Sequence, residues 1–556
     1  MNVLQNIKPL RCMVSMNCWK HSRAKRSTSS ATNIRRLPKF LQNSFNNPEK
    51  TAIVDSNGEH SYSKLACLSM NLSRNLPSLH GERVAFLTDN DASYVACKWS
   101  TWMKGGTCVP LCKSHPISEI DYVLQDSEPK ILIASSDHAN GLEDLSKKHG
   151  TELLILPKDF IDQYSEAGIL DDIDVQMSSH DNALIIYTSG TTGRPKGVVW
   201  THDHLQKQIE MMLAVWEWEY NDRILHVLPL HHVHGIINAM MCPLSIGATV
   251  VMENKFQPHK VWDHFLGKFE DFPPISVFMA VPTIYIKLLQ YYENNMKSKS
   301  DEIFEKCKKI RLMVSGSASL PATIFEKWKT LTSHELLERY GMTEVGMALT
   351  NSYRGQRIPG AVGRPFPGVE AMILAEDEEN IVVEADCNGV LKYPGMKGHQ
   401  GELLIRGPIF KEYWKRPDTT KEQFRKDGWF KTGDTAKFED ESFCIVGRTS
   451  VDIIKSGGFK IGALDIERHL LDHDNILEVA VLGVDDETWG QRVAAIIVLK
   501  DNNISFTVED LKLWCSNRMP HYNTPTLMKL VLEIPKNAMG KVNKKSLLNL
   551  FDEEQV

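Results

Sequence analysis

The most informative part of this sequence reads Tyr187-Thr-Ser-Gly-Thr-Thr-Gly-Arg-Pro-Lys-Gly197. Glycine lets the backbone fold back and aim successive N–H groups into one concavity, which suits an anion. The hydroxyl groups and the two cationic side chains add donors for phosphate oxygens. The loop lies between two apolar segments, 183–187 and 198–200, that predict strands. We therefore predict a nucleotide phosphate loop, and a solvated flexible loop is the alternative.

The N-terminal 48 residues differ in composition from the rest of the chain. They hold nine Lys and Arg and no Asp or Glu, and Ser and Thr cluster at Ser27–Thr32. A basic, acid-free and Ser-rich start is typical of a mitochondrial transit peptide, and a basic tail without that role is the alternative. We predict a transit peptide over residues 1–36 and a mitochondrial matrix location.

The charge and cysteine content exclude several classes of protein. Without the first 48 residues the chain has 55 Lys and Arg against 70 Asp and Glu, a net charge of −15. An acidic body argues against a nucleic-acid partner. No apolar run approaches the roughly 18 residues that a membrane span needs. The eleven cysteines include no Cys-x-x-Cys pair, which favours reduced thiols over a disulfide framework.

The length of 556 residues is too great for one core and predicts three or four folding units. Apolar segments at 83–87, 108–111, 131–134 and 153–156 alternate with helical patterns, which predicts an α/β unit with a mainly parallel sheet. Near the C-terminus, residues 463–518 read as a small α+β unit.

Four histidines occur within nine residues in His226-Val-Leu-Pro-Leu-His-His-Val-His-Gly235. Clustered histidines can bind a metal, but no Cys or carboxylate lies close to them in the sequence. We interpret this segment as the lining of a pocket, with metal binding as the less favoured alternative.

Further motifs follow in a fixed order along the chain. Leu336–Glu344 predicts a strand, a glycine turn, a hydroxyl and a carboxylate, and carboxylates beside a triphosphate commonly hold Mg²⁺. Trp429–Asp434 predicts an acid at the end of an aromatic strand, where it can accept hydrogen bonds from ribose. Gly447-Arg448 follows another strand, Asp452–Lys460 predicts a glycine-centred hairpin, and Ile534–Lys545 ends the series with a lysine cluster.

Together these motifs resemble the adenylate-forming superfamily, which includes acyl-CoA synthetases, luciferases and peptide-synthetase adenylation domains. The resemblance covers residues 37–556. It implies a large N-terminal adenylation domain over 37–448, made of α/β subdomains and a β-barrel-like part. It also implies a small, mobile α+β domain over 449–556, with a hinge at Thr449–Ser450.

The resemblance implies a two-step reaction with ATP, Mg²⁺ and coenzyme A. A substrate carboxylate attacks the α-phosphorus of ATP and releases pyrophosphate, and the CoA thiol then attacks the acyl-adenylate and releases AMP. Small molecules are the expected partners, and no obligate protein partner is implied.

Roles carry over from the superfamily to matching residues of this chain. The expected ATP-binding residues are Thr188, Ser189, Gly190, Thr191, Thr192, Gly193, Lys196, Tyr340, Asp434, Arg448 and Lys541. Lys541, Thr343 and Glu344 are the expected catalytic residues, with Glu344 holding Mg²⁺. Gly457 and Gly458 are expected to line the CoA tunnel.

Segments His226–Gly235, Phe278–Tyr285 and Arg311–Ala318 resemble those of mitochondrial malonyl-CoA and methylmalonyl-CoA synthetases, which narrows the resemblance. The second carboxylate of malonate requires a cation. The expected acid-binding residues are Arg339, Lys287, His234 and Ser315. Bacterial malonate enzymes carry an arginine where this chain has Lys287, which favours Arg339 over it. The alternative for Arg339 is an ion pair with Glu338 or another neighbour.

Three other functions remain open from the sequence. The first is a medium-chain fatty acyl-CoA synthetase of the same fold. The second is a peptide-synthetase adenylation domain, for which a transit peptide is unexpected. The third is a member that binds nucleotide without catalysis, and the joint presence of Lys196, Glu344, Asp434, Arg448 and Lys541 argues against it.

Overall fold

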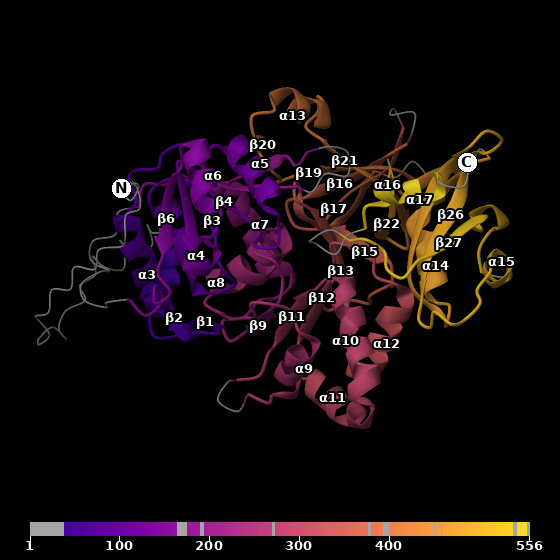
Figure 1. Ribbon diagram of the computed structural model, residues 1–556, viewed down its shortest axis with the longest axis horizontal. Helices are drawn as coiled ribbons and strands as arrows, with labels where there is room; N and C mark the ends of the chain where they lie inside the picture. The colour runs from indigo at the N-terminus through magenta and orange to yellow at the C-terminus, as the bar shows by residue number, and fades with distance from the viewer. Residues whose placement is uncertain are drawn as a thin grey trace, which may run out of the picture.

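The computed structural model describes residues 38–163, 175–188, 194–269, 273–375, 380–392, 400–449, 451–457, 459–516, 518–536 and 542–552. A large N-terminal part is built on two sheets, and a smaller C-terminal part, at the far right of Figure 1, is built on a third. The region predicted as a transit peptide lies outside the described residues. Among the helices of the described ranges, none is long and apolar enough to span a bilayer.

A seven-stranded sheet forms the first part of the fold, with strand order β20-β8-β7-β4-β3-β5-β6. Its five strands from β7 to β6 are parallel, as the alternating apolar segments predicted. The strands are β3 Arg83–Leu87, β4 Thr107–Pro110, β5 Ile131–Ser135, β6 Glu152–Leu156, β7 Asn182–Tyr187, β8 Gly197–Thr201 and β20 Glu412–Tyr413.

A fifteen-stranded sheet forms the second part. The half of this sheet that runs from β2 to β13 is parallel apart from the β1–β2 hairpin at its edge. The strands of this half, in spatial order, are β2 Gly58–Ser61, β1 Thr51–Asp55, β10 Thr249–Met252, β9 Arg223–His226, β11 Val277–Ala280, β12 Leu312–Ser315 and β13 Leu337–Met342. Parallel strands place their carboxyl ends at one edge, where ligands of open α/β sheets bind.

The second half of this sheet is antiparallel and corresponds to the part predicted as barrel-like. Its strand order is open, with β18 at the edge. The strands are β14 Gly346–Thr350, β15 Ala361–Pro365, β16 Glu370–Leu374, β17 Ile381–Asp386, β18 Gly389–Lys392, β19 Gln400–Arg406, β21 Phe430–Glu439 and β22 Ser442–Arg448.

The prediction that Asp434 ends a strand was wrong, because Asp434 lies within β21. Gly433 has a φ of +71°, and the pairing of β21 with β19 is irregular at this point. Glycine adopts such a φ without steric cost, so the strand bulges here and continues.

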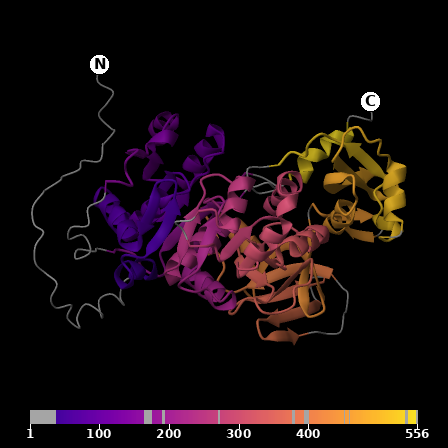
Figure 2. The same ribbon diagram turned by 90° about the horizontal axis from the view of Figure 1, so that it is seen from below.

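Helices cover the sheets of the N-terminal part, as Figures 1 and 2 show. Helix α7 shows ordinary capping chemistry: Thr201 accepts a hydrogen bond from the backbone N–H of His204 at its start. The helices are α2 Lys39–Asn46, α3 Tyr62–Arg74, α4 Ala92–Met103, α5 Ile117–Ser127, η1 Ser136–His138, α6 Leu142–His149, α7 His202–Val215, η3 His234–Met241, α8 Cys242–Ile246, α9 Pro258–Leu266, α10 Pro282–Asn295, η4 Lys297–Lys299, α11 Ser300–Cys307, α12 Ala322–Thr332 and α13 Pro417–Gln423.

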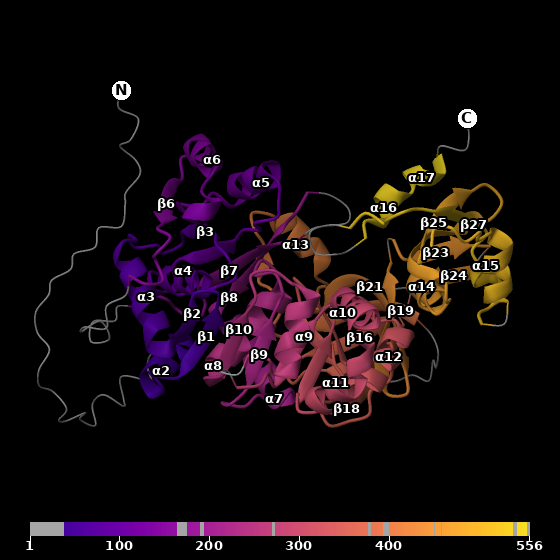
Figure 3. The ribbon, with the colours of Figure 1, turned by 60° about the horizontal axis from the view of Figure 1, so that its bottom comes forward.

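The C-terminal part is a small α+β unit with its own hydrophobic clusters, all from residues 454 onward. Figure 3 shows α16 and α17 along its upper edge. Its elements are β23 Ile453–Ser456, β24 Phe459–Gly462, α14 Ala463–Leu471, β25 Ile476–Asp486, β26 Gly490–Leu499, α15 Val508–Cys515, η5 His521–Asn523, β27 Leu527–Leu530, α16 Lys544–Leu547 and α17 Asn549–Asp552.

Candidate active site

The candidate site lies where the parallel half of the large sheet gives way to the antiparallel half. Strand β13 pairs in parallel with β12 and antiparallel with β14. Ser315 ends β12, and β13 carries Arg339 and Tyr340 next to it. Strands β21 and β22 bring Asp434 and Arg448 to the same region as a registered cross-strand pair.

A tyrosine, a carboxylate and an arginine form the first polar group of the site. The Tyr340 hydroxyl donates to Asp434 Oδ2 at 2.5 Å, and Arg448 Nε lies 3.1 Å from Asp434 Oδ1. Burial and the neighbouring Asp434 both raise the pKa of Tyr340, so its phenol keeps the proton that it donates. The Asp434 carboxylate is thereby fixed in position and can accept hydrogen bonds from vicinal hydroxyls.

The second polar group surrounds the buried carboxylate of Glu344. Burial raises its pKa, while the Tyr413 hydroxyl, which donates to Glu344 Oε1 at 2.9 Å, and the charges of Arg448 and Lys196 oppose that rise. Lys196 Nζ lies 4.7 Å from the centre of the Tyr413 ring. The carboxylate oxygens of Glu344 are ligands of the kind that Mg²⁺ prefers.

Both ends of the predicted phosphate loop are held together by main-chain and side-chain bonds. The N–H of Thr188 donates to Lys196 O at 3.0 Å, and the N–H of Lys196 donates to Thr188 Oγ1 at 3.4 Å. Close beneath the loop, the indole of Trp200 donates to the carbonyl of Thr343 at 3.1 Å. The loop residues Ser189, Gly190, Thr191, Thr192 and Gly193 lie outside the described residues.

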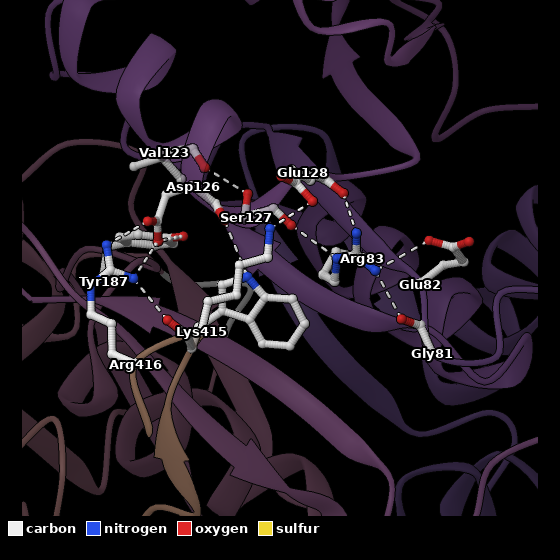
Figure 4. Close-up of polar contacts among 11 residues, drawn as sticks. Gly81, Glu82, Arg83, Val123, Asp126, Ser127, Glu128, Tyr187, Lys415 and Arg416 are labelled. Carbon is white, nitrogen blue, oxygen red and sulfur yellow. Dashed lines mark hydrogen bonds and ion pairs between the residues drawn. The ribbon is translucent and has the colours of Figure 1, made fainter. Parts of the chain in front are cut away.

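A polar network anchors the base of the loop to the segment that carries Tyr413 (Figure 4). The Tyr187 hydroxyl donates to Asp126 Oδ2 at 2.7 Å, and Arg416 Nη2 donates to Asp126 Oδ1 at 2.5 Å. Beside them, Lys415 Nζ lies 2.6 Å from Glu128 Oε2, and Arg83 donates to carbonyls at the end of α5. The segment carrying Tyr413 also pairs with β8 through β20. The network therefore fixes the position of the Tyr413 hydroxyl, which donates to Glu344.

The third polar group, around Arg339, differs from the first two because several of its buried polar atoms have no hydrogen-bond partner in the described part of the chain. Arg339 is 3% exposed, and the only side-chain hydrogen bond found for it in the described part of the chain is a long one, 3.4 Å, from Nη2 to Ser317 Oγ. Its Nε and Nη1 have no hydrogen-bond partner there, and neither have Ser315 Oγ and His234 Nε2. Burial lowers the pKa of Arg339 to about 9. No carboxylate pairs with this guanidinium among the described residues.

The backbone comes close to the guanidinium of Arg339. A Cβ added to Gly316 would lie 2.6 Å from Arg339 Cζ, so only glycine allows this approach. Ser317, with a φ of +70°, lies 3.4 Å from both Arg339 Nη2 and His234 Nδ1 through its Oγ. Burial and the positive charge of Arg339 hold the pKa of His234 well below its usual value, so its imidazole is neutral.

The alternative of an ion pair between Arg339 and Glu338 does not hold. Successive residues of β13 point to opposite faces. Glu338 accepts a hydrogen bond from the N–H of Gly360 at 2.7 Å, away from Arg339, and burial raises its pKa to about 7.

Lys287 does not join this group. It is exposed on α10, whose neighbouring residues Tyr285, Leu288 and Leu289 are buried. The 3.6-residue period turns Lys287 outward, so the expectation that it lines the acid pocket is not supported.

The segment predicted as the hinge contacts both β21 and the C-terminal part. Thr449 Oγ1 lies 2.9 Å from Thr435 Oγ1, and Asp452 accepts a hydrogen bond from the N–H of Arg448 at 2.9 Å. Lys544 lies 2.5 Å from Asp452 Oδ1 and 2.7 Å from Glu467 Oε1, buried between them. Ser450, Gly458 and Lys541 lie outside the described residues.

Gly457 occupies the predicted glycine hairpin with a φ of +56°. A Cβ there would lie 2.9 Å from the ring of Trp489. Arg468 of α14 also donates to Ser319 Oγ at 2.8 Å, so the C-terminal part contacts the loop that carries Ser317.

Sequence reasoning missed Tyr413, Gly316, Ser317 and Lys544. Gly316 and Ser317 follow Ser315 in a Ser/Gly turn, whose approach to Arg339 depends on the pairing of β12 with β13. Tyr413 gives no local signal, because its partner Glu344 is 69 residues away in the chain.

Comparison with known proteins identifies the family to which this chain is similar. The model of the AMP-binding enzyme family matches residues 40–414, and the model of the AMP-binding enzyme C-terminal domain matches residues 465–541. The chain is 48% identical over 525 residues to the mitochondrial malonate–CoA ligase of Xenopus laevis, covering 90% of each chain. It is 46% identical over 522 residues to the human protein of the same name, again with 90% of each chain covered.

Solved structures are similar over almost the whole chain. ATP-bound MatB from Rhodopseudomonas palustris superimposes with a TM-score of 0.80 at 30% identity, over 93% of this chain and 99% of that one. A malonyl-CoA ligase in a ternary product complex with methylmalonyl-CoA and AMP gives a TM-score of 0.61 at 28% identity, over 88% and 97%.

Proposed function

This chain belongs to the family of AMP-binding enzymes, and from that membership we propose that it joins malonate to coenzyme A in an ATP-dependent, AMP-forming reaction. It is an acyl-CoA synthetase whose relatives at 46–48% identity are named mitochondrial malonate–CoA ligases. Methylmalonate, which differs by one methyl group, is the second acid that we propose as a substrate.

One observation carries the choice of acid: the buried guanidinium of Arg339 has unpaired donors. Burying a charge without a partner is costly, and the cost is recovered when an anion binds with good geometry. The distal carboxylate of malonate supplies that anion, with Ser315 Oγ and His234 Nε2 as further hydrogen-bonding atoms. A fatty acid brings only its hydrocarbon chain to the same place and would leave the charge uncompensated.

ATP fits the two paired groups of the site. We propose that Asp434 accepts hydrogen bonds from the ribose hydroxyls, with Tyr340 and Arg448 holding the carboxylate in place. Lys196, Thr188 and the loop 189–193 would hold the β- and γ-phosphates, and Thr343 the α-phosphate. Glu344 would bind Mg²⁺, which supplies positive charge to the phosphate oxygens.

The first half-reaction needs positioning more than it needs a protein nucleophile. With its distal carboxylate held by Arg339, malonate presents the other carboxylate toward Thr343 and the α-phosphorus. That carboxylate attacks the phosphorus, pyrophosphate leaves, and the negative charge that develops is stabilised by Lys541, as we propose. Lysine suits this role because it carries a compact charge on a flexible stem.

The second half-reaction needs access for the thiol of coenzyme A. We propose that the C-terminal part rotates about Thr449–Ser450 and that Gly457 and Gly458 then line the path of the thiol. The higher TM-score with the ATP-bound relative, 0.80 against 0.61 for the product complex, supports an adenylation-like arrangement of the two parts in this structure.

We propose the mitochondrial matrix as the place of this reaction. The basic, acid-free N-terminal region supports it, and so does the word mitochondrial in the names of the vertebrate relatives.

The function is tested by CoA-dependent AMP formation with malonate, methylmalonate, succinate and octanoate. We expect malonate and methylmalonate to give the highest kcat/KM and octanoate to give at most a hundredth of the malonate value, because it leaves Arg339 unpaired. A preference for octanoate would instead identify a medium-chain fatty acyl-CoA synthetase, and AMP formation with none of these acids would argue against this function.

A further inference from the structure

A cysteine and two histidines lie together at the seam between the two sheets of the N-terminal part, outside the groups described above. Cys112 and His115 come from the segment that follows β4 of the seven-stranded sheet. His231 comes from the segment that follows β9 of the fifteen-stranded sheet. We considered His231 as a metal ligand only within its own histidine run, because 116 residues of the chain separate it from His115.

The ligand atoms of the cluster lie close enough together to hold one metal ion. One potential ligand atom from each of the three residues lies within 4.8 Å of the other two. Cys112 is 5% exposed, and the ring centres of His115 and His231 lie 5.5 Å apart. Nitrogen and sulfur ligands at such spacing are those that zinc uses in proteins.

One further contact and one buried ring nitrogen support the cluster as a built site. His115 Nδ1 lies 3.1 Å from Glu119 Oε2, one turn along the chain, which leaves its other ring nitrogen for a second partner. A carboxylate on the outer nitrogen of a histidine is the usual support for a metal-bound imidazole. His231 Nε2 is buried and has no hydrogen-bond partner in the described part of the chain.

We propose that Cys112, His115 and His231 bind one zinc ion, with Glu119 orienting His115. Thiolate and imidazole ligands favour Zn²⁺ over Mg²⁺ or Ca²⁺, which prefer oxygen. Three protein ligands leave the fourth tetrahedral position for a water molecule.

The site would join the two sheets at one point. A bound ion links the segment after β4 to the segment after β9, which runs on within three residues to His234 of the acid pocket. The binding of zinc does not depend on the proposed function, whereas an effect of zinc on the KM for malonate would rest on it.

The test is a titration of the full-length chain, stripped of metal by chelator, with Co²⁺ and then with Zn²⁺ in competition. We expect one equivalent of Co²⁺ to give the near-ultraviolet absorption of a thiolate–cobalt bond, and Zn²⁺ to abolish it. Cys112→Ser should remove the absorption and weaken zinc binding on the order of 100-fold or more. Cys387→Ser, at the turn between β17 and β18, is the matched control and should change neither.

A second variant keeps the test informative if Cys112→Ser fails to fold. Glu119→Gln retains all three ligands and should weaken zinc binding about 10-fold, since it removes only the support of His115. Glu143→Gln, an exposed carboxylate on α6, should leave the affinity unchanged. The proposal is overturned if wild type shows no thiolate–cobalt absorption, or if the absorption persists in Cys112→Ser.

Discussion

The two ends of the candidate site are built in opposite ways. At the nucleotide end, Asp434 is held by Tyr340 and Arg448, and Glu344 is held by Tyr413. At the acid end, Arg339 and His234 are as deeply buried but keep polar atoms without hydrogen-bond partners in the described part of the chain. The nucleotide end is preorganised, whereas the acid end stores a cost that only an anion relieves.

This difference predicts how substitutions at each end change the stability and the activity of the protein. Removing one partner from a paired end leaves the other buried and unsatisfied, which costs both stability and activity. Removing the unpaired arginine relieves a desolvation cost in the free protein while it abolishes the proposed contact with the substrate. Stability and activity should therefore change together at one end and in opposite directions at the other.

The largest expected effect comes from Arg339→Met, which keeps the length of the side chain and removes its charge. We expect kcat/KM for malonate to fall about 1,000-fold, since truncating a buried partner of a charge pair costs roughly 2–5 kcal/mol. The apparent melting temperature should stay the same or rise. Pyrophosphate release and thermal unfolding measure the two quantities.

The matched control is Arg311→Met, which removes an arginine that is paired. Arg311 Nε lies 2.7 Å from Asp222 Oδ1. Its loss leaves Asp222 buried without its partner, so the melting temperature should fall while the relative rates with malonate and octanoate stay the same. Arg339→Met would contradict the comparison if it behaved like this control.

The contrast also explains what the sequence could predict. Tyr340, Glu344, Asp434 and Arg448 belong to compact local motifs, and the structure brings them into one region. The partner of Glu344 could not be predicted, because Tyr413 reaches it only through the pairing of β20 with β8. Lys287 was expected in the acid pocket but is exposed on α10. Its apolar neighbours in the sequence do not show which face of the helix packs against the sheet.

Longer-range geometry accounts for the remaining differences. Asp434 lies inside β21, where the positive φ of Gly433 produces a bulge that no propensity reveals. Cys112 and His231 come together only because two different sheets place their strand ends at one seam. Local chemistry is readable in the sequence, whereas contacts between sheets depend on the whole topology.

The next largest effect concerns Glu338, the neighbour of Arg339 on the opposite face of β13. Burial raises its pKa to about 7, so the folded protein keeps a proton that the unfolded chain releases near pH 4.5. The free energy of unfolding should therefore fall by roughly 3 kcal/mol as the pH rises from about 4.5 to 7. Glu338→Gln should lose this part of the pH dependence.

Thermal unfolding at pH 5 and pH 8 checks this expectation. Relative to wild type, Glu338→Gln should gain stability at pH 8 and not at pH 5. Glu326→Gln, an exposed carboxylate on α12, should follow wild type at both values. An unchanged pH dependence in Glu338→Gln would show that its carboxyl group is not destabilising when ionised.

A smaller effect is expected at the nucleotide end from Asp434→Asn. The amide retains an acceptor for the Tyr340 hydroxyl but loses the charge that faces Arg448 and, as proposed, the ribose. We expect the KM for ATP to rise about 10- to 100-fold, since hydrogen bonds to charged groups contribute roughly 1.5–3 kcal/mol. The KM for malonate should change little, because Arg339 is untouched.

Initial rates with either substrate varied separate these two constants, with Asp427→Asn, on an exposed loop before β21, as the control. Equal increases in both KM values would mean that the two ends do not act independently. The division into a nucleotide end and an acid end would then be wrong.

The smallest expected effect comes from Tyr413→Phe, which keeps the ring beside Lys196 and removes one hydroxyl. Burial already raises the pKa of Glu344, and the Tyr413 hydroxyl opposes that rise. Its loss should raise the pKa further, so more of Glu344 is protonated at low pH and unable to bind a cation. We expect kcat/KM for ATP to fall about 10-fold near pH 6 and less at pH 8.

The pH profile, not the size of the loss, decides between two roles for Tyr413. If the hydroxyl keeps Glu344 ionised, the deficit must shrink as the pH rises, because alkaline solution restores the carboxylate without it. If Tyr413 only shapes the pocket, the deficit is the same at every pH. Tyr291→Phe on α10 should match wild type throughout, so a uniform loss in Tyr413→Phe alone would show that the nucleotide end is held by packing and not by its paired polar groups.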